Sequence, residues 1–184
     1  MSLGLIAKRY ATALHEFSLL KGEHQRIYNE AVWLTTTLKE HPEVREIVNS
    51  PIIEKSFKLS ILTRLPSDGF SSQMARFLRL IVEHERESMI LFILHSYQRI
   101  YKKHFGIRDV KLQSAYELNE ELCEEIRAVL QKRFGGMINL QQSVNSELIG
   151  GFKLRVDDLF ADTSVSSKLE ALRRHYTLSN KRIV

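Results

Sequence analysis

The first half of the chain has the hydrophobic pattern of a series of amphipathic helices. Apolar residues recur there at steps of three and four, the spacing that places side chains on one face of an α-helix. The same pattern, interrupted at Pro42 and Pro51 and by a turn at 66–69, predicts helices around residues 3–17, at 23–40 and 42–49, around 57–62, and at 71–83 and 87–105. Helices joined by such short connectors favour an all-α six-helix bundle over residues 1–106.

After Gly106 the period of the pattern changes from that of a helix to that of a strand. Val110 and Leu112 alternate with polar residues, as do Phe152, Leu154 and Val156. A strand around 138–140 and helices at 118–134 and after 164 complete a βαββα order. This order predicts a small α+β domain over residues 107–176. Residues 177–184 show no pattern, so we expect a disordered tail there.

Composition adds little to this picture of two folded parts. The chain has 184 residues, 43% of them hydrophobic, with a formal charge of +5 and a single cysteine, Cys123. No apolar run approaches the roughly 20 residues that span a bilayer, so we expect no membrane insertion. Basic residues are interspersed with acidic ones, which is more typical of solvated helix surfaces than of a phosphate-binding patch.

Residues suited to catalysis do not cluster in the sequence. The seven histidines are scattered, and none forms a metal-binding pair on one helical face. A glycine-rich loop ending in Gly-Lys-Ser/Thr, which would hold phosphates, is also missing from the sequence. We therefore predict no catalytic residues, no cofactor and no metal, and we expect a binding protein.

A sequence signature near the carboxyl end resembles that of a known protein family. Leu148-Ile149-Gly150-Gly151 precedes a strand, and Asp162-Thr163-Ser164 then precedes a helix with two spaced leucines. This ordered set resembles the C-terminal signature of the delta subunit of F-type ATP synthases, called oligomycin sensitivity conferral protein in mitochondria. The residues that match the signature are Leu148, Gly150, Gly151, Asp162, Ser164, Leu169 and Leu172.

Weaker matches extend the resemblance over nearly the whole chain. Residues 6–14, 50–55 and 77–86 resemble the family's opening motif, its Ser-Pro-x-Ile segment and its fifth helix with the arginine that follows. Two residues depart from the pattern, because Glu85 and Asp157 stand where the family usually has glycine. Aspartate tolerates left-handed backbone better than most residues, so we expect the turn at Asp157 to survive.

The resemblance implies a non-catalytic stator subunit in the peripheral stalk of a proton-translocating ATP synthase. In the family, the first and fifth helices form a groove for the N-terminal helix of a catalytic-head α subunit, and the C-terminal domain contacts the C-terminal ends of b subunits. The apolar stripe of the fifth helix is also wider than a core face requires. The predicted groove residues are Ala7, Tyr10, Ala13, Leu14, Phe77, Leu80 and Ile81.

Further expectations follow from the same resemblance. They are one copy per complex and a peripheral location at the cytoplasmic face of a bacterial membrane, with neither a cofactor nor nucleic acid bound. For any single groove residue, however, burial inside the bundle remains the simpler interpretation. A stand-alone basic helical module that binds nucleic acid or regulates another protein remains the alternative function.

Overall fold

The chain folds into two compact units, residues 1–102 and 103–184. The computed structural model describes residues 3–66, 69–157 and 159–180. The turn predicted at 66–69 includes residues 67 and 68, which lie outside this described part. The division falls four residues before the boundary expected from the change of period. Each unit is described by itself below.

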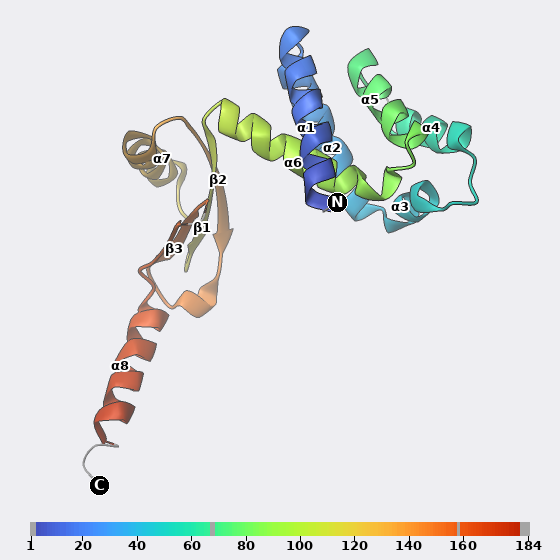
Figure 1. The fold of residues 1–184 in the computed structure, drawn as a ribbon. Helices are drawn as coiled ribbons and strands as arrows, with labels where there is room; N and C mark the ends of the chain where they lie inside the picture. Colours follow the sequence, from blue (N-terminus) through green and yellow to red (C-terminus); the bar gives the residue numbers. More distant parts are fainter. Residues whose placement is uncertain (1–2, 67–68, 158, 181–184) are drawn as a thin grey trace. The chain divides into compact units, whose positions relative to one another are not determined.

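Helices are the only regular elements among the described residues of the first unit (Figure 1). Its elements are α1 (Leu3–Leu20), α2 (His24–Glu40), α3 (Pro42–Asn49), α4 (Lys55–Arg64), α5 (Ser72–Glu83), the 3-10 helix η1 (Glu87–Met89) and α6 (Ile90–His104). The last predicted helix is thus divided, because its first turn is the separate η1. Local signals mark two helix starts: Pro42 begins α3, and the Ser71 hydroxyl accepts a hydrogen bond from the backbone N–H of Met74 at the start of α5.

Large apolar side chains fill the interior of the first unit. Its fully buried side chains include Leu14, Ile27, Leu34, Leu38, Leu62, Met74, Leu78, Ile81, Ile93 and Leu94. One ion pair lies inside this apolar environment: Lys58 Nζ of α4 and Glu87 Oε1 of η1 are 2.8 Å apart, and both side chains are less than a tenth exposed. This pair ties α4 to the corner between α5 and α6.

The second unit is a four-stranded sheet with helices, as far as its residues are described. Its elements are β1 (Ile107–Ser114), α7 (Glu120–Phe134), β2 (Met137–Val144), the 3-10 helix η2 (Ser146–Leu148), β3 (Phe152–Val156), β4 (Leu159–Asp162) and α8 (Val165–Asn180). The strand order is β2-β1-β3-β4. β1 pairs in parallel with β2 and antiparallel with β3, and β4 pairs antiparallel with β3.

Two sequence predictions for this unit need correction. The predicted βαββα order omitted β4, a strand of four residues whose adjacent Leu159 and Phe160 are both exposed and which therefore lacks an alternating pattern. The predicted tail at 177–184 is also partly wrong, because α8 continues to Asn180. Residues 181–184 lie outside the described part of the chain.

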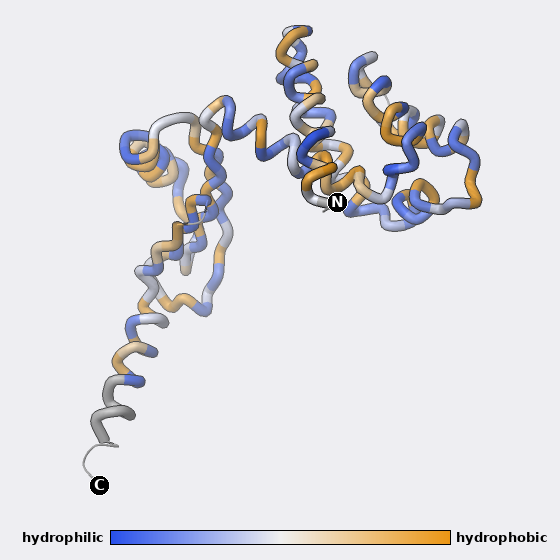
Figure 2. The backbone as a smooth tube through the Cα atoms, viewed as in Figure 1, coloured by the Kyte–Doolittle hydropathy of each residue, from blue (hydrophilic) through white to orange (hydrophobic). Residues whose placement is uncertain are grey.

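α7 covers only one face of the sheet. Leu130 packs with Val110, Ile138 and Val156, and the partly buried Ile126 and Phe134 extend this core. Figure 2 shows hydrophilic and hydrophobic residues on different sides of this helix. The opposite face of the sheet carries the polar residues of the strands, including Lys111 and Arg155, and these are exposed. The second unit therefore has a small one-sided core and an open polar face.

Candidate functional site

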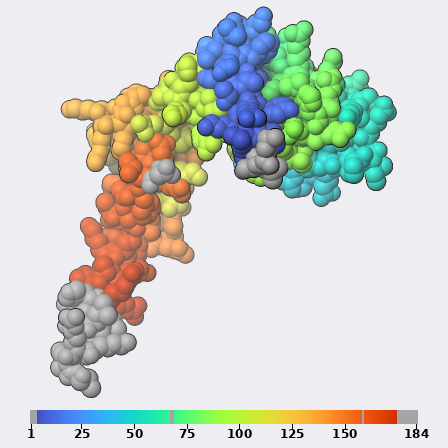
Figure 3. Space-filling model, in the orientation of Figure 1, coloured from blue at the N-terminus to red at the C-terminus, as the bar shows by residue number. Residues whose placement is uncertain are grey.

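The first candidate surface lies where α1 and α5 meet. The rings of Tyr10 and Phe77 are in edge contact, with centroids 6.4 Å apart, and the Arg86 guanidinium lies 5.8 Å from the centroid of the Tyr10 ring. Figure 3 shows α1 on the visible face of the molecule with α5 beside it. Arg86 follows α5, so one cation and two aromatic rings join the two helices.

The predicted groove residues divide into buried and exposed groups. Ala7, Leu14, Phe77 and Ile81 belong to the core of the unit, each less than a tenth exposed. Leu80 is 42% exposed, Ala13 is also exposed and Tyr10 is half-buried. Of the seven predicted groove residues, Tyr10, Ala13 and Leu80 are therefore the accessible ones, and the other four are buried in the core.

The exposed side of α1 also contains a residue that the sequence reasoning missed. A hollow of about 360 Å³ lies along this helix, lined by Leu5, Lys8, Arg9, Thr12, Ala13 and Glu16. Leu5 is 46% exposed at one end of the hollow. Its spacing of eight residues from Ala13 places both on one helical face, a signal hidden by the stronger buried stripe of the same helix.

The Gly-Gly signature permits close backbone packing in the second unit. A Cβ atom on Gly151 would lie 2.5 Å from the carbonyl oxygen of Thr163, and Gly151 has a φ of +76°. The backbone N–H of Val165 donates to the carbonyl oxygen of Gly150 at 2.9 Å. The signature glycines thus let the segment that begins α8 lie directly on the start of β3.

The Asp162 carboxylate organises the start of α8. Oδ1 accepts hydrogen bonds from the Ser164 backbone N–H at 2.9 Å and the Ser164 hydroxyl at 2.6 Å, while Oδ2 accepts from the Ser167 hydroxyl at 2.7 Å. Lys153 Nζ of β3 lies 3.2 Å from Oδ2. The Ser164 and Ser167 hydroxyls, the Ser164 backbone N–H and Lys153 all hold the pKa of Asp162 well below its usual range. Asp162 and Ser164 therefore join strand and helix.

The remaining signature residues have different environments. Leu148, the last residue of η2, is 2% exposed, whereas Leu169 and Leu172 on α8 are 51% and 56% exposed. The two spaced leucines of the signature are therefore not part of the core of this unit. Ile149 has a φ of +65°, an uncommon conformation for a β-branched residue, and its side chain is also exposed.

Both departures from the family pattern adopt the left-handed backbone that glycine accommodates. Glu85 has a φ of +55° and Asp157 a φ of +49°. Each carboxylate forms an ion pair of 2.7 Å, Glu85 with Lys55 and Asp157 with Arg108. These are exposed pairs, which compensate only in part for the cost of the conformation.

The described residues contain no group of three or more His, Cys, Asp or Glu side chains suited to a metal ion. Within that same part of the chain, no helix is both long and apolar enough to cross a membrane. What the geometry provides is exposed surface: the α1/α5 surface, the α8 leucines and the open face of the sheet. Such surfaces are suited to binding other molecules.

Comparisons with known proteins agree on one family. The family model described as ATP synthase delta (OSCP) subunit matches residues 6–176. The chain is 32% identical to the ATP synthase subunit delta of Caldanaerobacter subterraneus subsp. tengcongensis over 171 residues, covering 93% of this chain and 96% of that protein. It is 28% identical over 185 residues to the protein of the same name from Phocaeicola vulgatus, with full coverage of both.

The fold is also found in a solved assembly. A chain of the Toxoplasma gondii mitochondrial ATP synthase hexamer superimposes with a TM-score of 0.69 at 24% sequence identity, covering 93% of this chain and 97% of that one. At this identity the likeness concerns the fold alone. The nucleic-acid alternative receives no support from these comparisons.

Proposed function

The chain belongs to the ATP synthase delta (OSCP) subunit family, as its signature region predicted, and from this membership we propose how its two units act. Members of this family are non-catalytic subunits of the ATP synthase stator, and this is the function of the chain. We infer that the six helices of the first unit act as one bundle that holds the catalytic head, and that the second unit holds the peripheral stalk.

The α1/α5 surface supports the proposed contact with the head. Tyr10 contacts Phe77 between the two helices, and the accessible Ala13 and Leu80 each follow one of these residues by three positions, on α1 and α5. An amphipathic helix binds such a surface by placing apolar side chains at helical spacing against it. The proposed occupant is the N-terminal helix of an α subunit.

The second unit is the proposed attachment to the C-terminal ends of b subunits. Its exposed leucines on α8 and its uncovered sheet face are surfaces that its own residues leave open. One copy at the cytoplasmic face of the membrane would then join head to stalk. Rotor torque would drive conformational change in the head, coupled to proton flow, instead of turning the head with the rotor.

Substitution of Leu80 tests the contact with the head. Leu80→Asp places a charge against an incoming apolar helix, and an unpaired desolvated charge costs several kcal/mol. We expect binding of a peptide from the α-subunit N-terminus to weaken by at least about tenfold, measured by isothermal titration calorimetry. Phe92→Asp is the matched control, because Phe92 is 65% exposed on α6 and outside the proposed contact.

The same variant tests the function in the assembled complex. In membrane vesicles, Leu80→Asp should leave ATP hydrolysis by the head unchanged and reduce the proton pumping that hydrolysis drives. Wild-type peptide affinity and normal pumping in a correctly folded Leu80→Asp protein would show that Leu80 lies outside the contact. Loss of hydrolysis by the isolated head without this subunit would contradict a purely mechanical role.

A further inference from the structure

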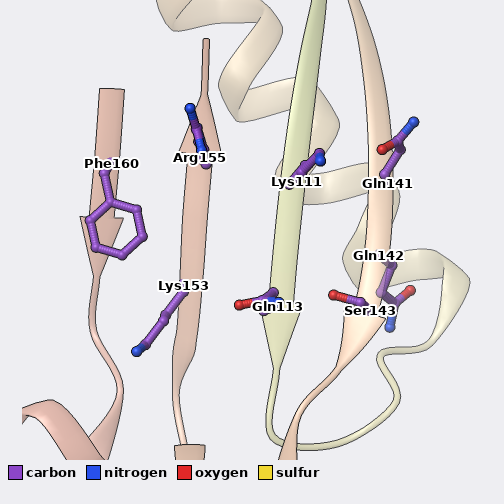
Figure 4. Close-up of a pocket in the computed structure, with 8 residues that line it drawn as sticks. All are labelled: Lys111, Gln113, Gln141, Gln142, Ser143, Lys153, Arg155 and Phe160. Atoms are coloured by element: carbon purple, nitrogen blue, oxygen red, sulfur yellow. The ribbon is translucent and has the colours of Figure 1, made fainter. Parts of the chain in front are cut away.

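The open face of the sheet has its side chains arranged in transverse rows. The strand register places Gln141 of β2 opposite Lys111 of β1, Lys111 opposite Arg155 of β3, and Arg155 opposite Phe160 of β4. Figure 4 shows these four residues side by side across the strands. The neighbouring row runs through Ser143, Gln113, Lys153 and Asp162. A hollow of about 470 Å³ lies over the two rows.

Two cations in the first row face each other without a carboxylate partner among the described residues. Lys111 and Arg155 are directly opposite on antiparallel strands, an arrangement of like charges that destabilises a sheet. The Arg155 Nε donates to the backbone carbonyl oxygen of Asp157 at 3.2 Å, a neutral acceptor. The pair therefore carries two positive charges that the described residues of the unit leave without an ion-pair partner.

The acidic residues on this face are already engaged. Asp162 binds Lys153 and the serines at the start of α8, so it neutralises the cation of the second row and not those of the first. Asp109, one row further along β1, accepts a hydrogen bond of 2.9 Å from the Asn139 side chain. A carboxylate supplied from outside would therefore find its two donors at Lys111 and Arg155.

The residues that flank this cation pair define the rest of the surface. Phe160 is 65% exposed at one end of the row, and Gln141 is exposed at the other. Gln113 and Ser143 add neutral hydrogen-bonding groups in the adjacent row. A peptide ligand would match this order of groups if it carried an apolar side chain beside an anionic one. Its backbone could form hydrogen bonds with the neutral polar side chains.

We propose that the open face of the sheet binds an acidic segment of the stalk subunit, with a carboxylate between Lys111 and Arg155 and an apolar side chain against Phe160. This inference rests on the proposed attachment of the second unit to the stalk and assigns that contact to one face. A protein carboxylate fits better than nucleic acid, because duplex-binding surfaces typically contact about 6–10 phosphates and this row has two unpaired cations. Arginine and lysine bound to a carboxylate form charge-assisted hydrogen bonds, which also weaken with salt when exposed.

Removing the charges of Lys111 and Arg155 in the full-length chain tests whether the open face of the sheet binds the stalk subunit. Lys111→Gln/Arg155→Gln is compared with Lys132→Gln/Arg133→Gln, which removes the same charge from the exposed end of α7 on the opposite face. The probe is the stalk b subunit without its membrane segment, and affinity is measured at two salt concentrations. We expect the first variant to bind at least about tenfold more weakly and with less salt dependence, and the second to bind within about twofold of wild type.

An independent measurement locates the contact if the variant is poorly folded. On addition of the same b fragment, backbone amide NMR signals of wild-type Lys111, Arg155, Phe160 and Gln141 should shift, while those of α7 stay in place. Shifts confined to α8, or equal affinity of a folded Lys111→Gln/Arg155→Gln protein, would overturn the assignment and leave stalk attachment intact.

Two other outcomes separate the remaining possibilities. If wild-type protein fails to bind the b fragment, the proposed stalk attachment itself is wrong, and the inference falls with it. If duplex DNA binds the wild type more tightly than the b fragment does, and the Lys111/Arg155 substitutions abolish that binding, the face is a nucleic-acid surface and the inference is wrong.

Discussion

The two units of this chain are stabilised by different kinds of contact. Of the buried apolar residues among the described ones, 20 lie in the first unit and seven in the second. The seven of the second unit include one core cluster, formed by Val110, Leu130, Ile138 and Val156. This unit adds close backbone contact at Gly151 and the hydrogen bonds of Asp162. Apolar burial thus dominates one unit, while backbone fit and polar bonding contribute a larger share in the other.

The buried ion pair between Lys58 and Glu87 tests this contrast most strongly, because it is a polar contact within the apolar core of the first unit. Lys58→Met should destabilise the first unit by about 3–5 kcal/mol, because it leaves the Glu87 carboxylate buried without its partner. The double variant Lys58→Met/Glu87→Met should recover most of that loss, since apolar replacement of a whole buried pair is often neutral. Urea denaturation followed by circular dichroism measures both. A single variant as stable as wild type would contradict the importance of this pair.

Gly151→Ala tests the other half of the contrast, the contribution of close backbone contact to the stability of the second unit. The new methyl group would meet the Thr163 carbonyl oxygen, and the φ of +76° would be strained for alanine, so we expect a loss of about 2–3 kcal/mol in the second unit. Hydrogen exchange should accelerate in β3 and α8 and remain unchanged in α1 and α2. Gly69→Ala is a useful control, because its φ is also positive but no atom lies within 4 Å of the added methyl group.

The smallest effect concerns a feature that both units share. Glu85→Gly and Asp157→Gly each remove the backbone strain of a non-glycine residue in the left-handed conformation. Each also removes one exposed ion pair. Because the strain exceeds the stabilisation of an exposed pair, we expect melting temperatures to rise by a few degrees at most. The rise should be larger for Glu85→Gly, since aspartate tolerates this conformation better than glutamate. A decrease in both variants, measured by calorimetry, would show that the ion pairs dominate.

The elements predicted from sequence are those with clear boundary signals. The helix starts predicted at residues 42, 71 and 118 agree with those of α3, α5 and α7 within two residues. β4 was missed because a short exposed strand is defined by its partner β3 and not by its own pattern. The end of α8 was also misjudged, since residues 177–180 lack any periodic apolar pattern although they are helical.

The candidate surfaces were less predictable than the fold. Periodicity places residues on a stripe but does not tell which edge of the stripe is covered: Ile81 is fully buried, while its neighbour Leu80 is 42% exposed. The cation pair on the sheet could not be found from sequence either. Lys111 and Arg155 are 44 positions apart and become neighbours only through the register of β1 and β3.

The joint at Asp162 also has a mechanical consequence for α8. The helix has 16 residues, about 24 Å at the usual rise, and packs against η2 near its start, as Figure 1 shows. It therefore resembles a lever clamped at one end: a tilt of about 5° at the first turn displaces the far end by about 2 Å. The stiffness of this joint under load then depends on four contacts to a single carboxylate, together with the packing of α8 against η2.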